Sequence, residues 1–239
     1  MTLIQGRWTD SVHQGLQNML THYSRPLPER PVAVFDWDNT CITGDIGEAV
    51  LRHLDTSHHP GCVAKYLELC ETYDKSVGYT FCAEALGGLT EGDAETLINE
   101  VIDRQIAAGS IQARPEIEAL MHAMTDSGWD VWMVTASAQP IVRAFAPRYK
   151  QPADRVIGVE LAVKNGVIQP TLAGPLTYRQ GKVDAIDQRI GRRPTFAAGD
   201  ALTDYEMLHA APHALLFDHG NAELLTAAES RGWWVQPPF

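Results

Sequence analysis

The amino-acid sequence predicts an α/β fold, a doubly wound parallel sheet with a helical cap inserted after the first strand. Short apolar runs such as 31–35 and 130–134 alternate with segments of helical periodicity, which is the pattern of strands and crossover helices in a parallel sheet. Apart from Asp130 at the start of the second run, these runs are continuously apolar, as in strands that are buried on both faces. Residues 46–106 contain no comparable run. This segment interrupts the alternation and is therefore expected to be an inserted helical unit.

The composition is that of a globular protein. Of the 239 residues, 45 % are hydrophobic and 21 % are charged, and the net charge is −11. This balance excludes disordered, collagen-like and coiled-coil architectures, and the acidic charge argues against a nucleic-acid partner. We find no signal-peptide run and no apolar stretch of about 18 residues, and expect no membrane span. The four cysteines include no C-x-x-C pair, which favours free thiols in a reducing compartment. We expect a cytoplasmic protein and leave its oligomeric state open.

The first elements follow from local periodicity. A helix is expected over residues 8–22, where apolar side chains share one face: Val12, Leu16, Met19 and Leu20. A loop rich in proline and charge then leads to the strand over 31–35. After the insertion, a helix is expected to begin at Pro115 and to end before Gly128, because proline is favoured in the first helical turn and glycine after the last.

The second half of the chain continues the alternation. Pro140 is expected to begin a helix, and residues 156–168 to form a small hairpin around an Asn165–Gly166 turn. The remaining predicted elements are helices over 181–190, 203–210 and 221–230 and strands over 195–198, 214–217 and 233–235. These elements divide the chain into a core of residues 1–44 and 107–239 and a helical cap of residues 45–106.

Acidic and hydroxyl side chains follow three of the predicted strands. They are Asp36 and Asp38 after the first, Thr135 and Ser137 after the second, and Asp200 and Asp204 after the third. Because the carboxyl ends of parallel strands meet at one edge of the sheet, we expect the four carboxylates to share a small volume. They repel one another there unless a hard divalent cation lies among them, and oxygen ligands favour Mg²⁺. The alternative is that each is a turn residue or helix cap, which suits Asp204 alone better than the pair after the first strand.

In these motifs the sequence resembles the haloacid dehalogenase superfamily, and in particular its phosphatase branch. That superfamily is marked by four motifs, which residues 34–40, 131–135, 181–182 and 199–204 resemble in the same order. The resemblance covers about residues 30–230. The long gap after the first motif implies a helical cap, as in the phosphoserine-phosphatase-like branch.

The resemblance implies a role for each motif residue. Asp36 would be the nucleophile, which forms an aspartyl-phosphate, and Asp38 would act as general acid and then general base. The Mg²⁺ ligands would be Asp36, the backbone carbonyl of Asp38, and Asp200, with Asp204 supporting the site directly or through its neighbours.

Two further motif residues would contact the phosphate. Thr135 would donate its hydroxyl to a phosphoryl oxygen. Lys182 would pair with the phosphate and with the nucleophile, although a lone lysine at that place is otherwise a solvated residue at a helix start.

Other reactions fit the motifs less well. A metal-free dehalogenase of this superfamily uses one aspartate and leaves Asp38 and Asp200 without a purpose. A phospho-receiver module, which is regulatory and not an enzyme, is about half this length and has no cap. A phosphomutase would retain the phosphoryl group. We therefore expect a phosphatase that acts on a small phosphorylated metabolite.

We expect residues of the cap to determine which substrate the protein recognises. Asp45 lies nine residues after Asp36, where relatives specific for phosphoserine carry an acidic residue that faces an amine. Those relatives also carry a cap arginine for the serine carboxylate, and residues 74–103 contain no arginine. A cationic head group such as phosphocholine therefore fits better, with Asp45 and Ser137 as candidate substrate contacts, and the string at 36–40 is also similar to bacterial phosphorylcholine phosphatases. The alternatives are phosphoserine as the substrate and Asp45 as a solvated helix cap.

Overall fold

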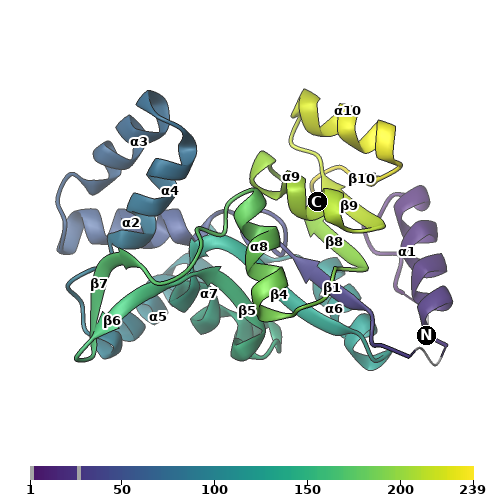
Figure 1. Cartoon of the computed structure of the whole chain (residues 1–239), viewed down its shortest axis with the longest axis horizontal. Coiled ribbons are helices and arrows are strands. Elements are labelled where there is room, and N and C mark those ends of the chain that lie inside the picture. The colour runs from purple at the N-terminus through teal and green to yellow at the C-terminus, as the bar shows by residue number, and fades with distance from the viewer. Residues whose placement is uncertain (1–2, 26–27) are drawn as a thin grey trace.

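The computed structural model describes residues 3–25 and 28–239 (Figure 1). It shows a six-stranded parallel sheet with helices on both faces and a group of helices set to one side. The predicted fold class, an α/β protein with a helical insertion after the first strand, is confirmed.

The central sheet places the ends of its middle strands around one crevice. Its strands are β1 (Val32–Phe35), β4 (Asp130–Ala138), β5 (Val156–Val159), β8 (Phe196–Gly199), β9 (His213–Phe217) and β10 (Trp234–Gln236). Their order is β10-β9-β8-β1-β4-β5, and all neighbouring pairs are parallel. The order reverses at β1, so the carboxyl ends of β1, β4 and β8 border the switch point where open α/β sheets bind ligands.

Two hydrophobic cores lie on the two faces of this sheet. The helices on one face are α1 (Asp10–Tyr23), α6 (Pro115–Asp126) and α7 (Gln139–Phe145), and those on the other are α8 (Gln180–Arg189), α9 (Tyr205–Ala210) and α10 (Ala222–Arg231). Successive strand residues point to opposite faces, so Ala33 and Phe35 enter the first core while Val32 and Val34 enter the second. Both faces of β1 are therefore buried, which is why its sequence is apolar without alternation.

Local signals in the sequence begin and end several helices. The Thr9 side chain caps α1 by accepting a hydrogen bond from the Val12 N–H, and Pro115 is the first residue of α6. Gly128 follows α6 with φ of 84°, a left-handed conformation that favours glycine.

Three short 3₁₀ segments complete the core: Ala146–Tyr149, Ala153–Arg155 and Leu202–Asp204. No helix among the described residues combines the length and apolar character needed to cross a bilayer.

A helical insert lies between β1 and β4, as the sequence analysis expected for this part of the chain. It consists of α2 (Ile46–Ser57), α3 (Cys62–Thr72), α4 (Lys75–Glu84) and α5 (Glu91–Ala107), and Figure 1 shows it beside one end of the sheet. The chain enters and leaves it through a two-stranded antiparallel ribbon of β2 (Ile42–Thr43) and β3 (Gln112–Ala113). Buried apolar residues of α2 and α5 belong to the same hydrophobic core as α6 and α7.

The hairpin expected over residues 156–168 is wrong in its first half. Residues Val156–Val159 form β5, which pairs in parallel with β4 at the edge of the central sheet. All four residues are buried, so they have no polar face that a solvent-exposed hairpin strand would need. The hairpin itself consists of β6 (Leu161–Lys164) and β7 (Val167–Leu172). Its turn is the predicted Asn165–Gly166, with φ of 55° and 74°.

This β6–β7 hairpin is bound to the helical insert through the backbone. The Gly88 N–H donates to the Ile168 carbonyl at 2.9 Å, and the Ile168 N–H donates to the Leu89 carbonyl at 2.9 Å. The Glu91 N–H donates to the Gly166 carbonyl at 3.0 Å. The loop between α4 and α5 therefore pairs with β7 much as a short antiparallel strand would.

The buried face of α1 gives a test of the core. Leu16 is fully buried, and we expect Leu16→Ala to lower the free energy of unfolding by about 2–5 kcal/mol, because it leaves a cavity. The matched control is Asn18→Ala on the exposed face of α1, expected to change it by no more than about 0.5 kcal/mol. Urea unfolding followed by tryptophan fluorescence measures both, and equal effects would contradict the assignment of the buried face.

Candidate active site

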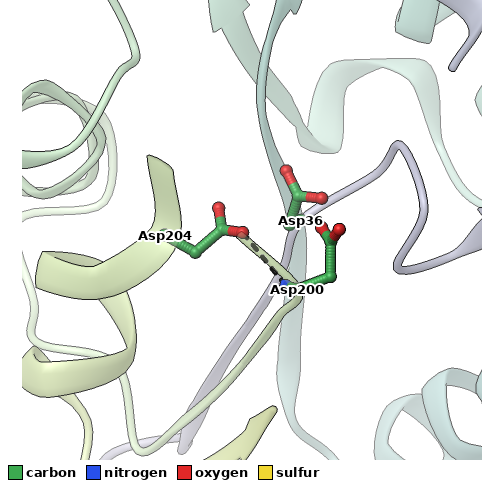
Figure 2. Close-up of side chains that lie close together, drawn as sticks. All are labelled: Asp36, Asp200 and Asp204. Atoms are coloured by element: carbon green, nitrogen blue, oxygen red, sulfur yellow. Dashed lines mark hydrogen bonds between the residues drawn. The ribbon is translucent and has the colours of Figure 1, made fainter. Parts of the chain in front are cut away.

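Three aspartates from different parts of the chain meet at the switch point of the sheet. Asp36 directly follows β1, Asp200 directly follows β8, and Asp204 ends the 3₁₀ turn before α9. Each offers one oxygen atom, and these atoms all lie within 4.8 Å of one another. Figure 2 shows the carboxyl groups of Asp36 and Asp200 side by side, with Asp204 reaching toward them from its helical turn. The parallel strands thus bring together three of the four aspartates that the sequence analysis expected to cluster.

A buried lysine neutralises part of this charge. The Lys182 Nζ, on α8, donates to Asp36 Oδ1 at 2.6 Å, to Asp204 Oδ1 at 2.5 Å and to the Val134 carbonyl at 2.9 Å. Its side chain is fully buried. Burial alone lowers the pKa of Lys182, but the adjacent carboxylates of Asp204 and Asp36 outweigh it and raise that pKa above its usual value. All three N–H donors therefore have protein acceptors, and the lysine remains charged.

One positive charge does not balance three carboxylates. Burial, and then the charge of Asp204, raise the pKa of Asp36 to about 7, although Lys182 acts in the opposite direction. Burial and the charge of Asp36 also raise the pKa of Asp200. A divalent cation would stabilise the ionised forms of both groups, and their all-oxygen donors are those that Mg²⁺ prefers. The residues present therefore fit a Mg²⁺ ion.

Asp204 is held within the loop that carries Asp200. Its Oδ2 accepts hydrogen bonds from the backbone N–H groups of Asp200 and Ala201, each at 3.1 Å, while Oδ1 accepts from Lys182. The close packing requires glycine at position 199, because a Cβ there would lie 2.6 Å from the Asp204 Cβ. With both oxygens engaged and the side chain fully buried, Asp204 orients the backbone at Asp200.

The two threonines near the ends of β1 and β4 have different partners. The Thr40 hydroxyl donates to Asp200 Oδ1 at 3.2 Å. Thr135, near the end of β4, accepts from the Ser137 N–H at 3.0 Å through its hydroxyl oxygen, and a hydroxyl that accepts can also donate. Thr177, which the sequence analysis did not select, donates its hydroxyl to the Thr135 carbonyl at 2.6 Å.

Asp38 turns away from the other three aspartates and toward the insert. Its Oδ1 accepts from the Ile46 N–H at 2.7 Å and its Oδ2 from the Ser137 hydroxyl at 2.7 Å. The N–H of Ile46 is free to donate because it is the first residue of α2 and has no partner within the helix. Burial, followed by the charges of Asp45 and Asp36, raises the pKa of Asp38 well above its usual value, so this carboxyl readily holds a proton.

A small cavity lies between the insert and the end of β4. Its lining includes Asp45, Glu48, Tyr66, Tyr79 and Ser137, so both residues predicted to contact the substrate border the same space. The Asp45 carboxylate also caps α2, accepting from the Glu48 N–H at 2.8 Å. Burial raises the pKa of Asp45 to about 6. A larger groove between α5, α7 and the β6–β7 hairpin contains none of the site aspartates.

Two other residues near the site were not selected from the sequence. Arg114 is 3 % exposed, donates to the Asn39 carbonyl at 3.0 Å and stacks over the Phe217 ring at 5.1 Å. His219 Nε2 lies 3.7 Å from Asp200 Oδ2. His219 lies two residues after β9, so a search for polar residues that follow predicted strands could have found it. No local sequence pattern indicates Arg114.

The comparison with protein families agrees with this geometry. A family model described as haloacid dehalogenase-like hydrolase matches residues 33–209, a span that contains every aspartate of the site and Lys182. The chain belongs to the haloacid dehalogenase-like hydrolase family. The helical insert and the residues that meet at the switch point thus lie within the region that the family model matches.

One curated relative shows how far the sequence similarity extends. The chain is 25 % identical over 193 residues to the phosphorylcholine phosphatase of Pseudomonas aeruginosa, which is 64 % of this chain and 55 % of that protein. It thus spans little more than half of that relative's length.

Solved structures share the fold at lower identity. A protein of unknown function from Anaerococcus prevotii matches with a TM-score of 0.78 and 18 % identity, over 100 % of this chain and 98 % of that one. A probable phosphoserine phosphatase from Vibrio cholerae matches with a TM-score of 0.63 and 16 % identity, over 96 % and 69 %.

Replacing the buried lysine tests the charge balance. We expect Lys182→Met to lower the free energy of unfolding by about 3–5 kcal/mol in metal-free buffer, because it leaves buried carboxylates without their cation. Adding Asp36→Asn to this variant should recover part of the loss. The control is Lys164→Met, at an exposed position in the hairpin, which should change stability by no more than about 0.5 kcal/mol. Urea unfolding measures all three, and a Lys182 effect as small as the control would contradict the pairing.

Proposed function

We propose that this protein is a Mg²⁺-dependent phosphatase that hydrolyses a small phosphorylated metabolite through an aspartyl-phosphate intermediate. One observation carries the proposal: Asp36 lies at the switch point, held by the buried Lys182 beside two further aspartates. A carboxylate nucleophile divides the hydrolysis of a phosphomonoester into two easier steps. The family membership and the phosphatase among its relatives support the same reaction.

In the first step, the Asp36 carboxylate attacks phosphorus while the bond to the leaving oxygen breaks. Lys182 holds Asp36 Oδ1 and so orients the carboxylate, and its charge offsets the charge of the transition state. Thr135 donates its hydroxyl to a phosphoryl oxygen. Asp38 protonates the leaving oxygen, for which its raised pKa suits it.

In the second step, the now ionised Asp38 takes a proton from a water molecule whose oxygen attacks phosphorus. The bond between phosphorus and Asp36 breaks, which releases inorganic phosphate and regenerates the free Asp36 carboxylate. The residues that would hold Mg²⁺ are Asp36, Asp200 and the backbone carbonyl of Asp38, with Asp204 supporting the Asp200 loop. When bound, the ion neutralises phosphate charge and aligns the attack.

We propose that residues 45–106 act as a cap over a core formed by residues 1–44 and 107–239. The cavity that contains Asp45 and Ser137 lies where the insert meets β4, on the side to which Asp38 points. The space is about large enough for one water molecule, so the leaving group would enter it when the insert moves away from β4. The four cysteines are free thiols, which supports a reducing, cytoplasmic location.

We propose further that the leaving group carries a cationic head, as phosphocholine does. Asp45 and Glu48 give the cavity negative charge, and Tyr66 and Tyr79 give it aromatic side chains, which together suit an ammonium group. The similarity to a phosphorylcholine phosphatase supports this substrate class. Phosphoserine is the second candidate, because structures of phosphoserine phosphatases share the fold.

The nucleophile can be tested directly. We expect the protein to release phosphate from p-nitrophenyl phosphate and from phosphocholine or phosphoserine with Mg²⁺ present, and Asp36→Asn to abolish turnover while the protein stays folded. A carboxamide cannot replace the attacking carboxylate. Asp126→Asn, at an exposed position on α6, should retain full activity. Phosphate release and circular dichroism measure both effects, and more than trace activity of Asp36→Asn after correction for deamidation would refute the assignment.

Removing the metal gives an independent test. We expect EDTA to abolish turnover and excess Mg²⁺ to restore it, because Lys182 alone does not balance the carboxylates and the phosphate. The measurement is steady-state turnover during titration with Mg²⁺ after dialysis against EDTA. Full activity in excess EDTA would contradict a metal-dependent mechanism.

Asp45 is the residue whose exchange should change substrate preference. We expect Asp45→Asn to raise KM for phosphocholine about fivefold, since a partly desolvated charge pair contributes about 1 kcal/mol, and to leave p-nitrophenyl phosphate nearly unchanged. Glu71→Gln, exposed on α3, is the control and should alter neither. A loss shared equally by both substrates would instead assign Asp45 to the phosphate site or to the fold.

A further inference from the structure

The Asp38 carboxyl is held between the core and the insert by two donors. The Ser137 hydroxyl reaches Oδ2 from the end of β4, and the Ile46 N–H reaches Oδ1 from the first turn of α2, each at 2.7 Å. A backbone N–H can only donate, so it favours an unprotonated Oδ1 and leaves the proton of the acid form to Oδ2. Ser137 is thus the partner of the oxygen that would exchange protons.

A hydroxyl is suited to this position because it can both donate and accept. It can donate to Oδ2 when Asp38 is ionised and rotate to accept when Oδ2 carries the proton. Ser137 also lines the small cavity between the insert and the core, so this contact borders the space proposed for the leaving group.

The insert leaves room for this contact. A Cβ at Gly47 would lie 2.5 Å from the Ser137 Oγ and 3.3 Å from Asp45 Oδ1. Any larger residue at position 47 would therefore displace the serine hydroxyl from Asp38 or shift α2. The contact between Ser137 and Asp38 therefore depends on having glycine at position 47.

We propose that Ser137 is a positioning residue that aims the Asp38 carboxyl at the leaving-group oxygen. This inference rests on the proposed function. As the bond between phosphorus and the leaving oxygen breaks and the bond to Asp36 forms, the proton on Asp38 Oδ2 passes to the leaving oxygen. In the second step, Asp38 recovers a proton from the attacking water, and Ser137 keeps its own proton throughout.

The test compares two esters that differ in how much they need a proton. p-Nitrophenyl phosphate releases a weakly basic phenolate that departs without one, whereas benzyl phosphate releases a basic alkoxide that requires one. We measure kcat/KM, which reports the steps up to loss of the leaving group and omits the second, shared step. Ser137→Ala is expected to lower kcat/KM for benzyl phosphate about ten- to a hundredfold more than that for p-nitrophenyl phosphate.

Ser137→Thr keeps the hydroxyl and is expected to restore kcat/KM for benzyl phosphate to within about threefold of the unaltered enzyme. Gly47→Ala retains Ser137 but crowds it, and should reproduce the selective loss on benzyl phosphate. Equal losses on both esters in Ser137→Ala, no loss on either, or no recovery in Ser137→Thr would each overturn the proposal. If the unaltered enzyme hydrolyses neither ester with Mg²⁺, the proposed function fails, and this assignment fails with it.

Discussion

The buried ammonium of Lys182 is the interaction on which the rest of the site depends. Three aspartates lie within reach of one another in a place with little water, where repulsion between like charges is strong. Lys182 binds two of them together with the Val134 carbonyl, so it connects the ends of β1 and β4 to the turn before α9. Removing an ion pair from water is costly, and the attraction between the charges offsets that cost only when their geometry is good. The positions of these elements are therefore interdependent.

The backbone conformation of the residues just before Lys182 determines where α8 begins and where this lysine lies. Arg179 has φ of 51°, which is unusual for a residue with a side chain, and its N–H donates to the Thr203 carbonyl at 2.9 Å. Gly181 cannot be replaced without movement, because a Cβ there would lie 1.8 Å from the Leu176 carbonyl oxygen. The left-handed residue and the glycine thus begin α8 at the position from which Lys182 reaches Asp36 and Asp204.

Much of this site could be predicted from the sequence because it follows from topology. Buried strands are recognisable as apolar runs, and parallel strands bring the residues after them to one edge, which is how Asp36 and Asp200 were selected. Lys182 lies on a helix rather than at a strand end, so only the family resemblance marked it. The contacts of Asp38 depend on how the insert packs against β4, and Arg114 approaches through tertiary structure. The sequence around Asp38 and Arg114 shows no periodicity or local motif that would predict these contacts.

The pairing of the loop between α4 and α5 with β7 restricts how the insert can move. If the β2–β3 ribbon were its only connection to the core, the insert could rotate about that ribbon. The hydrogen bonds of Gly88, Ile168 and Glu91 add a second backbone attachment far from that ribbon in the chain, and the apolar residues of α2 and α5 also pack into the core of α6 and α7. A movement of the insert away from the sheet must therefore either break these contacts or carry the β6–β7 hairpin along. Because the hairpin directly follows β5, such a motion reaches the edge strand of the central sheet.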